Sequence, residues 1–213
     1  MIDYINSNRR LHIVTIEDPI EYIHPCKKSI VNQRSVGYHT RSFSRALRAA
    51  LREDPDVVLV GEMRDLETTQ LAITAAETGH LVFGTLMTAS AHKTVDRVID
   101  AFPANQQSQV RTMLSESLRA VIYQQLLKRS DGSGRVAALE VLVGTAPLRS
   151  LIRESKTYQI PSMMQIGIKD GMIVMDAAIV NLFRSGKISE EEAYRKMENP
   201  KIFEQFMAKA KGQ

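Results

Sequence analysis

The sequence contains a single cysteine, Cys26, and no tryptophan. One cysteine cannot form an internal disulfide, so we expect a reduced, packed thiol in a reducing cytosol. No apolar run approaches the roughly 18–20 residues that a membrane-spanning helix needs. The opening residues, MIDYINSNRR, also lack the apolar core of a secretory signal. These absences predict a cytoplasmic protein rather than a secreted or integral membrane protein.

A phosphate-binding loop of the usual pattern is absent as well. The pattern G-x-x-x-x-G-K-[ST] occurs nowhere in the 213 residues. The tract GSGRV, residues 132–136, has neither the lysine nor the hydroxyl residue of that loop. It also precedes an expected strand, whereas a phosphate loop precedes a helix. We interpret it as a hairpin turn.

The composition is that of an ordinary globular protein, with 44% apolar and 24% charged residues. A chain of 213 residues can bury one sizeable core, or one core with a smaller appendage. The formal charge of +4 is mild, and aromatic residues make up only 6%. Neither value is typical of a nucleic-acid platform that stacks bases, so we expect no nucleic-acid partner.

Apolar segments alternate with amphipathic helical patterns over most of the chain. Short runs rich in β-forming residues predict strands at LHIVTIE, VVLV and HLVFGTL, with helices between and after them. A polar stretch up to Arg41 is expected to be a loop. The segments AVIYQQLLKR and RVAALEVLVG predict a hairpin. We therefore predict an α/β fold with a largely parallel sheet that helices cover on both faces.

From Thr145 onward the pattern favours helices only. We place a boundary near Gly144, which predicts an α/β domain over residues 1–144 and a small helical domain over residues 145–213. Gly186 is expected to close one of these helices, and Ser189 with Glu192 predicts a capping box at the start of the next.

Polar residues follow three of the predicted strands. Because ligands of parallel α/β sheets bind beyond the carboxyl ends of the strands, these residues are expected to meet at one edge. An acid at one strand end is often only a turn or a helix cap, but three such ends converging favour a site. The three groups are Glu17, Asp18 and Glu21; Glu62, Arg64 and Asp65; and Thr85, Thr88 and Ser90.

This pattern fits phosphoryl transfer. That reaction requires little covalent chemistry from the protein. The protein must position Mg²⁺, orient a water molecule and neutralise the charge that develops in the transition state. A glutamate at the end of an apolar strand can polarise the water, and carboxylates on the neighbouring strand can help hold the metal and its water shell. Hydroxyl groups at the third strand end could sense the terminal phosphate.

Four stretches resemble motifs of the secretion and pilus motor ATPases, and among these most closely the type IV pilus retraction (twitching-motility) ATPases. TIEDPIEY resembles their acidic box, DVVLVGEMRD their atypical Walker B motif, and ETGHLVFGTL the start of their histidine box. GTAPLRSLIRE resembles the retraction motif of their C-terminal helical domain. The likeness runs from about His12 to at least Glu154.

The resemblance implies roles for individual residues. Glu62 matches the general base, and Glu21 matches a second essential acid. The residues that match positions supporting the nucleotide and Mg²⁺ are Glu17, Asp18, Arg34, Arg52, Arg64, His80 and Thr85. The residues that match the retraction motif are Arg149, Leu151, Ile152, Arg153 and Glu154. No metal is expected to bind this chain directly, because Mg²⁺ enters with ATP.

The resemblance also implies a RecA-like ATPase core within a ring, expected to be a hexamer, that drives pilus retraction. Its partners would be an inner-membrane platform protein and, indirectly, pilin, at the cytoplasmic face of the inner membrane. In the family, a sensor-like domain and the phosphate loop precede the matching region. The chain therefore resembles a C-terminal fragment, and we expect it not to hydrolyse ATP measurably by itself.

Two motifs depart from the family pattern. Met87 stands where the histidine box has its second histidine, and methionine cannot donate a strong hydrogen bond. Pro147 and Ser150 replace residues that are usually alanine and asparagine in the retraction motif. Two other functions stay open at this point: a binding or regulatory module that joins rings without turnover, and, less favoured, a nucleic-acid translocase.

Overall fold

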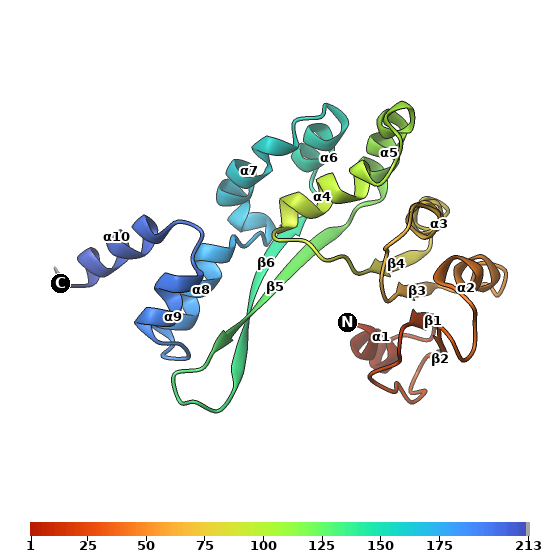
Figure 1. Ribbon diagram of the computed structural model, residues 1–213, viewed down its shortest axis with the longest axis horizontal. Helices are drawn as coiled ribbons and strands as arrows, with labels where there is room; N and C mark the ends of the chain where they lie inside the picture. The colour runs from red at the N-terminus through yellow and green to blue at the C-terminus, as the bar shows by residue number, and fades with distance from the viewer. Residues whose placement is uncertain (212–213) are drawn as a thin grey trace. The chain divides into compact units, whose positions relative to one another are not determined.

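A computed structural model describes residues 1–211 of the chain (Figure 1). The chain forms two compact units. The first comprises residues 1–87 and 97–117, and the second comprises residues 88–96 and those from 118 onward. The predicted α/β fold class is confirmed. Within the described residues, no helix is both long enough and apolar enough to cross a membrane.

The first unit is built on a parallel sheet of the order β2-β1-β3-β4. Its strands are β1 (His12–Glu17), β2 (Ile30–Ser35), β3 (Val57–Val60) and β4 (Leu81–Gly84). Glu17 pairs with Ser35, Ile16 with Val60, and Val60 with Gly84, so the strands end in near register. All four carboxyl ends therefore lie along one edge of the sheet, which is called the carboxyl edge below.

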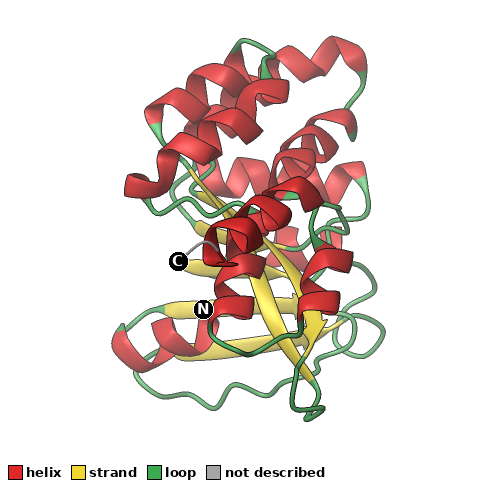
Figure 2. Cartoon of the chain, turned by 90° about the vertical axis from the view of Figure 1, so that its left-hand side faces the viewer, coloured by secondary structure: helices red, strands yellow, loops and turns green. Residues whose placement is uncertain are grey.

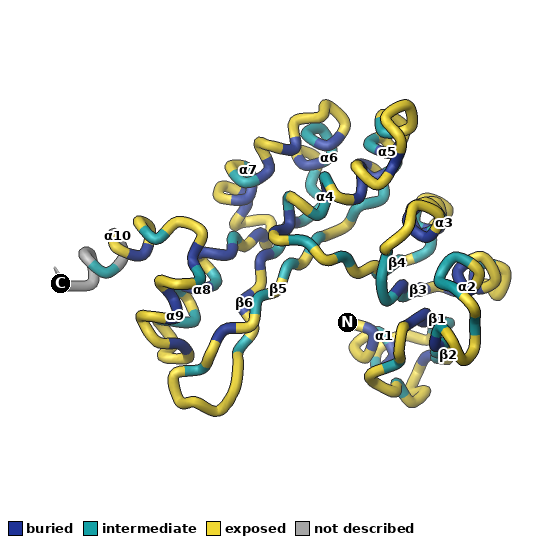
Figure 3. Tube along the Cα trace, in the orientation of Figure 1, coloured by how far each residue is buried: buried dark blue, intermediate teal, exposed yellow. Residues whose placement is uncertain are grey.

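Helices cover both faces of this sheet, as predicted. On one face, α2 (Phe43–Ala50) and α3 (Leu66–Glu77) bury Leu47 and Ala72 against Ile16, Val58 and Val60. On the other face, α1 (Ile2–Asn8) packs Ile2 against Ile13 and Val57. The traces of β1 and β3 are largely buried, whereas the outer turns of α2 and α3 are exposed (Figure 3).

Strand β2 was not expected from the sequence, which predicted a loop there. Its sequence, IVNQRS, has only two apolar residues, because β2 is an edge strand and its polar side chains find individual partners. In the same unit, α5 (Ala104–Ser117) packs on α3.

The second unit contains the predicted hairpin of β5 (Ala120–Lys128) and β6 (Arg135–Val143), the longest strands in the described part of the chain (Figure 2). Leu127 and Ala138 on one face of the hairpin join a core with Met175, Ile179 and Ala193. These last residues come from α8 (Met175–Arg184) and α9 (Glu190–Lys196). The domain boundary predicted near Gly144 falls inside this unit and stays a prediction.

The remaining helices are α4 (Ala91–Asp100), α6 (Ala146–Arg153), α7 (Ile160–Ile166) and α10 (Pro200–Lys211), with two short 3-10 turns at residues 157–159 and 167–170. Gly186 follows α8 with a φ of +67°, which only glycine adopts freely, so its predicted role is confirmed. The expected capping box is half formed. Ser189 Oγ accepts from the Glu192 backbone N–H at 3.2 Å, but the Glu192 carboxylate accepts from Lys128 N at 3.0 Å instead.

Candidate active site

The end of β3 lies directly against the end of β1 because residue 61 is a glycine. Gly61 N donates to the Ile16 carbonyl at 2.7 Å. A Cβ atom on Gly61 would lie 2.9 Å from that oxygen and 3.1 Å from Glu17 Cα, closer than side-chain carbons normally approach. The glycine of the apolar strand therefore allows the backbone that carries Glu17 to pass beside the backbone that carries Glu62.

The end of β4 joins the same arrangement from the other side. The Thr85 hydroxyl donates to the Gly61 carbonyl, and Met63 N donates to the Thr85 carbonyl at 3.0 Å. Residues 61–63 thus lie between the ends of β1 and β4. The structure brings Glu17, Glu62 and Thr85 to neighbouring strand ends, one from each of the three strands that the sequence singled out.

Glu62 forms an ion pair with Arg64. The distance from Arg64 Nε to Glu62 Oε1 is 2.5 Å, and the Glu62 side chain is 21% exposed. The hydrogen bond from Arg64 lowers the pKa of Glu62, although partial desolvation opposes it. Asp18 adds to the attraction that raises the pKa of Arg64, so Asp18 lies within electrostatic reach of this pair. Glu62 is therefore a carboxylate at neutral pH, able to accept a hydrogen bond from a water molecule.

Glu17 is buried and held by two hydrogen bonds. Its Oε1 accepts from Thr15 Oγ1 at 2.5 Å and from Gln33 Nε2 at 3.0 Å. Both bonds end on the same oxygen, which leaves Oε2 for another donor or for a cation. Neither of these hydrogen-bond partners of Glu17 carries a charge.

Glu21 lies on an exposed segment, residues 18–28, which we call the acidic loop. Two side-chain amides attach this loop to the unit. Gln33 Oε1 accepts from His24 N at 2.7 Å, and its Nε2 donates to the Tyr22 carbonyl at 2.9 Å. Asn6 Oδ1 accepts from Lys27 N at 3.0 Å, and its Nδ2 donates to the Pro25 carbonyl at 2.8 Å. Within residues 1–211, no hydrogen bond or ion pair joins the Glu21 carboxylate to Glu62.

Arg52 lies at the amino edge of the sheet, opposite the carboxyl edge, whereas Arg34 is the last but one residue of β2 and pairs with Ile16, next to the carboxyl edge. The Arg34 guanidinium donates to both carboxylate oxygens of Glu53, at 2.7 and 2.6 Å. The Glu53 carbonyl is 3.1 Å from Nδ1 of His12, the first residue of β1. Arg52 is exposed and follows α2, before β3 begins. Among the described residues, neither arginine has a hydrogen bond or an ion pair with Glu62.

His80 is also placed at the amino edge, because it precedes β4. Its Nδ1 lies 3.0 Å from the Ala75 carbonyl and 3.2 Å from Thr78 Oγ1, at the end of α3. Met87, at the position expected for a histidine, is 85% exposed.

The residues of the retraction motif lie on and just after α6 in the second unit. Ile152 is fully buried and Leu151 is partly buried, so both support the packing of this unit. Arg153 is exposed. Arg149 Nε is buried without a hydrogen-bond partner among the described residues. The hydrogen bond from Lys156, at 2.8 Å, lowers the pKa of Glu154.

Sequence reasoning missed the residues that hold the acids, namely Thr15, Gln33 and Asn6. The periodicity of apolar residues, which predicts strands and helices, does not single out a neutral amide within a polar stretch. Gln33 could have been noticed only if β2 had been recognised as a strand, because the register then places Gln33 beside Thr15.

The donor set at the carboxyl edge suits Mg²⁺ bound together with a nucleotide. Among residues 1–211, no group of three His, Cys, Asp or Glu side chains could hold a metal ion without help. Mg²⁺ commonly binds through one or two carboxylates plus phosphate oxygens and waters. Glu17, with a free oxygen, and the neighbouring Asp18 match that mode of binding.

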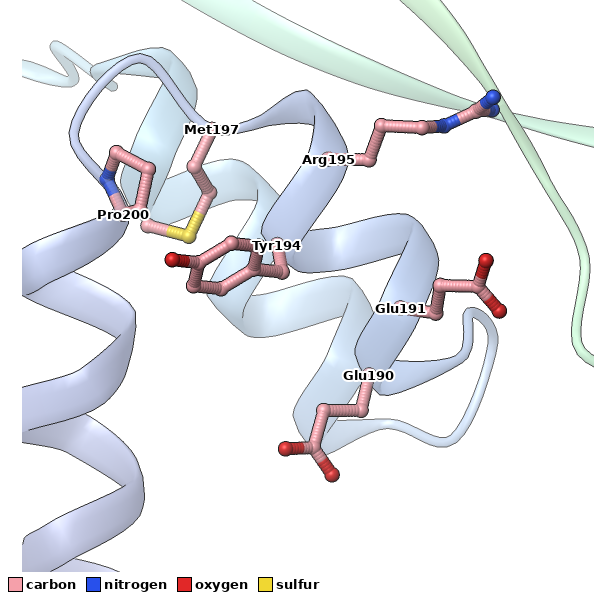
Figure 4. Close-up of a pocket in the computed structure, with 6 residues that line it drawn as sticks. All are labelled: Glu190, Glu191, Tyr194, Arg195, Met197 and Pro200. Atoms are coloured by element: carbon pink, nitrogen blue, oxygen red, sulfur yellow. The ribbon is translucent and has the colours of Figure 1, made fainter.

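A separate open groove lies in the second unit, between α9 and α10. In Figure 4, the Tyr194 ring and Met197 lie next to Pro200, whereas Glu190 and Glu191 point away from them and Arg195 projects to the other side of the helix. The polar groups do not converge there. None of the residues that line this groove belongs to the predicted site.

Comparison with known proteins gave consistent matches. The model of the family described as "Type II/IV secretion system protein" matches residues 1–200. The chain is 58% identical over 199 residues to a twitching motility protein of Neisseria gonorrhoeae, which covers 93% of this chain and 53% of that protein. It is 57% identical over 203 residues to the type IV pilus retraction ATPase PilT of Pseudomonas aeruginosa, covering 95% of this chain and 59% of that protein.

Among solved structures, a crystal structure of the pilus retraction motor PilT with bound ADP matches with a TM-score of 0.88 and 53% identity. The match covers 96% of this chain and 58% of the solved chain. The chain thus spans little more than half the length of the curated relatives that it matches.

Proposed function

Because this chain belongs to the family of type II/IV secretion system proteins, we propose that it is part of an ATP-hydrolysing motor that drives the retraction of type IV pili. Its relatives include a pilus retraction ATPase and a twitching motility protein. The observation that supports the proposal most is the meeting of Glu17, Glu62 and Thr85 at adjacent strand ends around Gly61.

In this proposal each acid has a separate task. Glu62, kept ionised by Arg64, accepts a hydrogen bond from the attacking water and orients it. Glu17 and Asp18 would hold Mg²⁺ and its water shell, and Glu21 is a second essential acid carried by the acidic loop. When bound with the nucleotide, Mg²⁺ neutralises charge on the phosphates. The Thr85 hydroxyl bonds the end of β4 to the backbone beside Glu62. A displacement of one strand end therefore also displaces the other.

The two arginines fit a role between subunits. Among the described residues neither Arg34 nor Arg52 pairs with Glu62, so in this proposal they act at the nucleotide of a neighbouring subunit in a ring, which we propose to be a hexamer. Arginine is suited to this task because it presents several donors to phosphate oxygens. His80 supports the nucleotide from the amino edge. The retraction motif, from Arg149 to Glu154, transmits the domain rotation that ATP hydrolysis drives.

We propose that the motor acts in the cytoplasm, at the inner face of the inner membrane. Its partner there would be the pilus platform protein and, through it, pilin. The cofactors are ATP and Mg²⁺. The phosphate loop that G-x-x-x-x-G-K-[ST] describes would come from outside these residues. Three lost phosphate contacts at roughly 1.5–3 kcal/mol each would weaken nucleotide binding by about three to six powers of ten.

The test joins this chain to the upstream half of the Pseudomonas aeruginosa relative, which supplies the part of the relative that the chain does not span. The fusion is expected to hydrolyse ATP, and Glu62→Gln is expected to lower kcat by about 100-fold or more. Glu67→Gln is the matched control, because Glu67 is an exposed glutamate of α3 paired with Arg48. Hydrolysis that persists in the Glu62→Gln fusion would refute the role of Glu62.

A second candidate is a binding or regulatory module that enters rings without turnover. The exposed methionine at position 87, in place of a phosphate-sensing histidine, favours it. In that case the fusion would assemble with its relatives but hydrolyse no ATP.

A further inference from the structure

We propose that Gln33 is a positioning residue that fixes both Glu17 and the acidic loop at the carboxyl edge of the sheet. The inference rests on the proposed function, since it assigns to Gln33 the task of arranging two acids of that site. Gln33 itself would touch neither the nucleotide nor the attacking water.

The amide of Gln33 uses all of its polar atoms on this one region. Its Nε2 donates to Glu17 Oε1 at 3.0 Å and to the Tyr22 carbonyl at 2.9 Å. Its Oε1 accepts from His24 N at 2.7 Å. The opposite orientation of the amide would place its NH₂ group against a backbone N–H and its oxygen against two acceptors. The three partners therefore permit a single orientation.

The strand register explains why this residue can reach both partners. Gln33 on β2 pairs with Thr15 on β1, so its side chain lies on the same face as Thr15 and Glu17. Because β2 is an edge strand, the acidic loop can run past its outer side, and the side chain spans from the sheet to that loop. Thr15 and Gln33 then both donate to Oε1 of Glu17, so that Oε2 points away from them.

The acidic loop has two anchors of the same chemical kind. Gln33 holds Tyr22 and His24, and Asn6 on α1 holds Pro25 and Lys27. Glu21 immediately precedes the first anchor, so the position of its backbone depends on Gln33 more than on Asn6. An uncharged anchor has a chemical advantage here, because it orients carboxylates without cancelling the charge that attracts Mg²⁺.

The first experiment measures hydrogen–deuterium exchange on this chain and needs no catalytic activity. Gln33→Ala is expected to make the His24 amide exchange about 3- to 10-fold faster, with residues 20–24 following. Asn32→Ala is the matched control. It removes the neighbouring amide on the same strand, which bonds to His12 Nε2 at 2.9 Å and not to the acidic loop. Equal exchange of His24 in the two variants would overturn the proposal.

The second experiment separates the two tasks of Gln33 in the fusion described above. Gln33→Glu keeps an acceptor for His24 N–H, but it can donate neither to Glu17 nor to the Tyr22 carbonyl, and it places a second carboxylate beside Glu17. We expect exchange at His24 slower than in Gln33→Ala, with kcat lowered about tenfold or more and KM for ATP changed by less than about threefold. Asn32→Ala should leave both constants unchanged.

The outcomes distinguish the two proposals. A kcat of Gln33→Glu and Gln33→Ala equal to that of Asn32→Ala would overturn the positioning role, even if exchange at His24 is faster. If the unchanged fusion hydrolyses no ATP, the proposed function fails, while the exchange result on the chain still decides whether Gln33 holds the acidic loop.

Discussion

Arg64 Nε lies 2.5 Å from Glu62 Oε1 at the end of β3, so the carboxylate with the principal proposed role is held by a cation two residues away. The hydrogen bond from Arg64 lowers the pKa of Glu62. A carboxylate with a lowered pKa is a weak base. It suits phosphoryl transfer, in which the attacking water needs orientation more than early loss of its proton.

The first prediction concerns this ion pair. Arg64→Ala should return the pKa of Glu62 to the ordinary glutamate range, because the cation that lowers it is gone. The check is a carbon-13 NMR titration of the Glu62 carboxylate in the chain itself. Arg48→Ala removes an exposed ion pair to Glu67 and should leave the Glu62 titration unchanged. An unshifted Glu62 in Arg64→Ala would show that something other than Arg64 sets its pKa.

The second prediction concerns Gly61. A methyl group there would meet the backbone of Ile16 and Glu17, which cannot move without separating β1 from β3. We expect Gly61→Ala to lower the free energy of unfolding by about 1–3 kcal/mol, as overpacking does in cores. Urea denaturation measures this change.

Gly84→Ala is the matched comparison for Gly61→Ala. Its added methyl group would first meet the flexible Met63 side chain, at 2.7 Å from Sδ, so the loss should be smaller. If the two variants lost equal stability, the close approach of β1 and β3 would not be the reason for the glycine at position 61.

The carboxyl edge was predictable because its placement follows from topology. Once VVLV and HLVFGTL are recognised as parallel strands of one sheet, Glu62 and Thr85 must lie at the same edge. Glu17 follows by the same rule from β1. The sequence offered no comparable signal for β2, because its last four residues, 32–35, are all polar and show no alternation of apolar and polar residues.

Residues recognised through family motifs are harder to place than strand ends. A motif match transfers a residue's identity but not the edge of the sheet on which it acts. Arg52 and His80 lie at the amino edge, and the Arg34 guanidinium pairs with Glu53 rather than with an acid of the carboxyl edge. The supporting amides of Asn6 and Gln33 depend on tertiary hydrogen bonds, which no local pattern encodes.

A third prediction concerns Glu192, which joins α9 to the hairpin. Its buried carboxylate accepts from Lys128 N at 3.0 Å and from the Arg195 guanidinium at 2.6 Å. Glu192→Ala leaves the Lys128 N–H without this partner and should lower the free energy of unfolding by about 1–3 kcal/mol. Glu192→Gln keeps an acceptor oxygen and should lose less. Chemical denaturation at neutral pH compares the three proteins.

The contribution of Glu192 to folding stability changes with pH in a defined direction. Burial raises its pKa, but the hydrogen bonds from Lys128 and Arg195 outweigh burial, and the pKa is lowered overall. A lowered pKa means that the carboxylate stabilises the fold above the ordinary glutamate pKa, and that this contribution is lost as the pH falls through the folded value. The stability advantage over Glu192→Gln should therefore shrink in acid. An advantage that grows in acid would contradict the assignment.

The last prediction concerns Glu140, a buried carboxylate of β6. Its contribution to folding stability changes with pH in the opposite direction to that of Glu192. Its Oε2 accepts from Ala91 N, at the start of α4, at 2.7 Å. Desolvation raises its pKa, the Ala91 hydrogen bond opposes this, and the charges of Glu198 and Asp176 add to the rise. A raised pKa means that the stabilising contribution is complete below the ordinary glutamate pKa and is lost as the pH rises through the folded value.

Glu140→Gln tests this sign because glutamine keeps the acceptor oxygen for Ala91 and removes the charge that burial disfavours. Relative to the unchanged chain, the variant should gain stability as the pH rises from the acid range to neutral, and the difference should vanish below the ordinary glutamate pKa. Denaturation curves at a series of pH values measure it, with Glu140→Ala as the comparison that loses the hydrogen bond at every pH. A variant that is less stable than the unchanged chain at neutral pH would mean that the ionised carboxylate, and not merely its acceptor oxygen, holds the start of α4 on the hairpin.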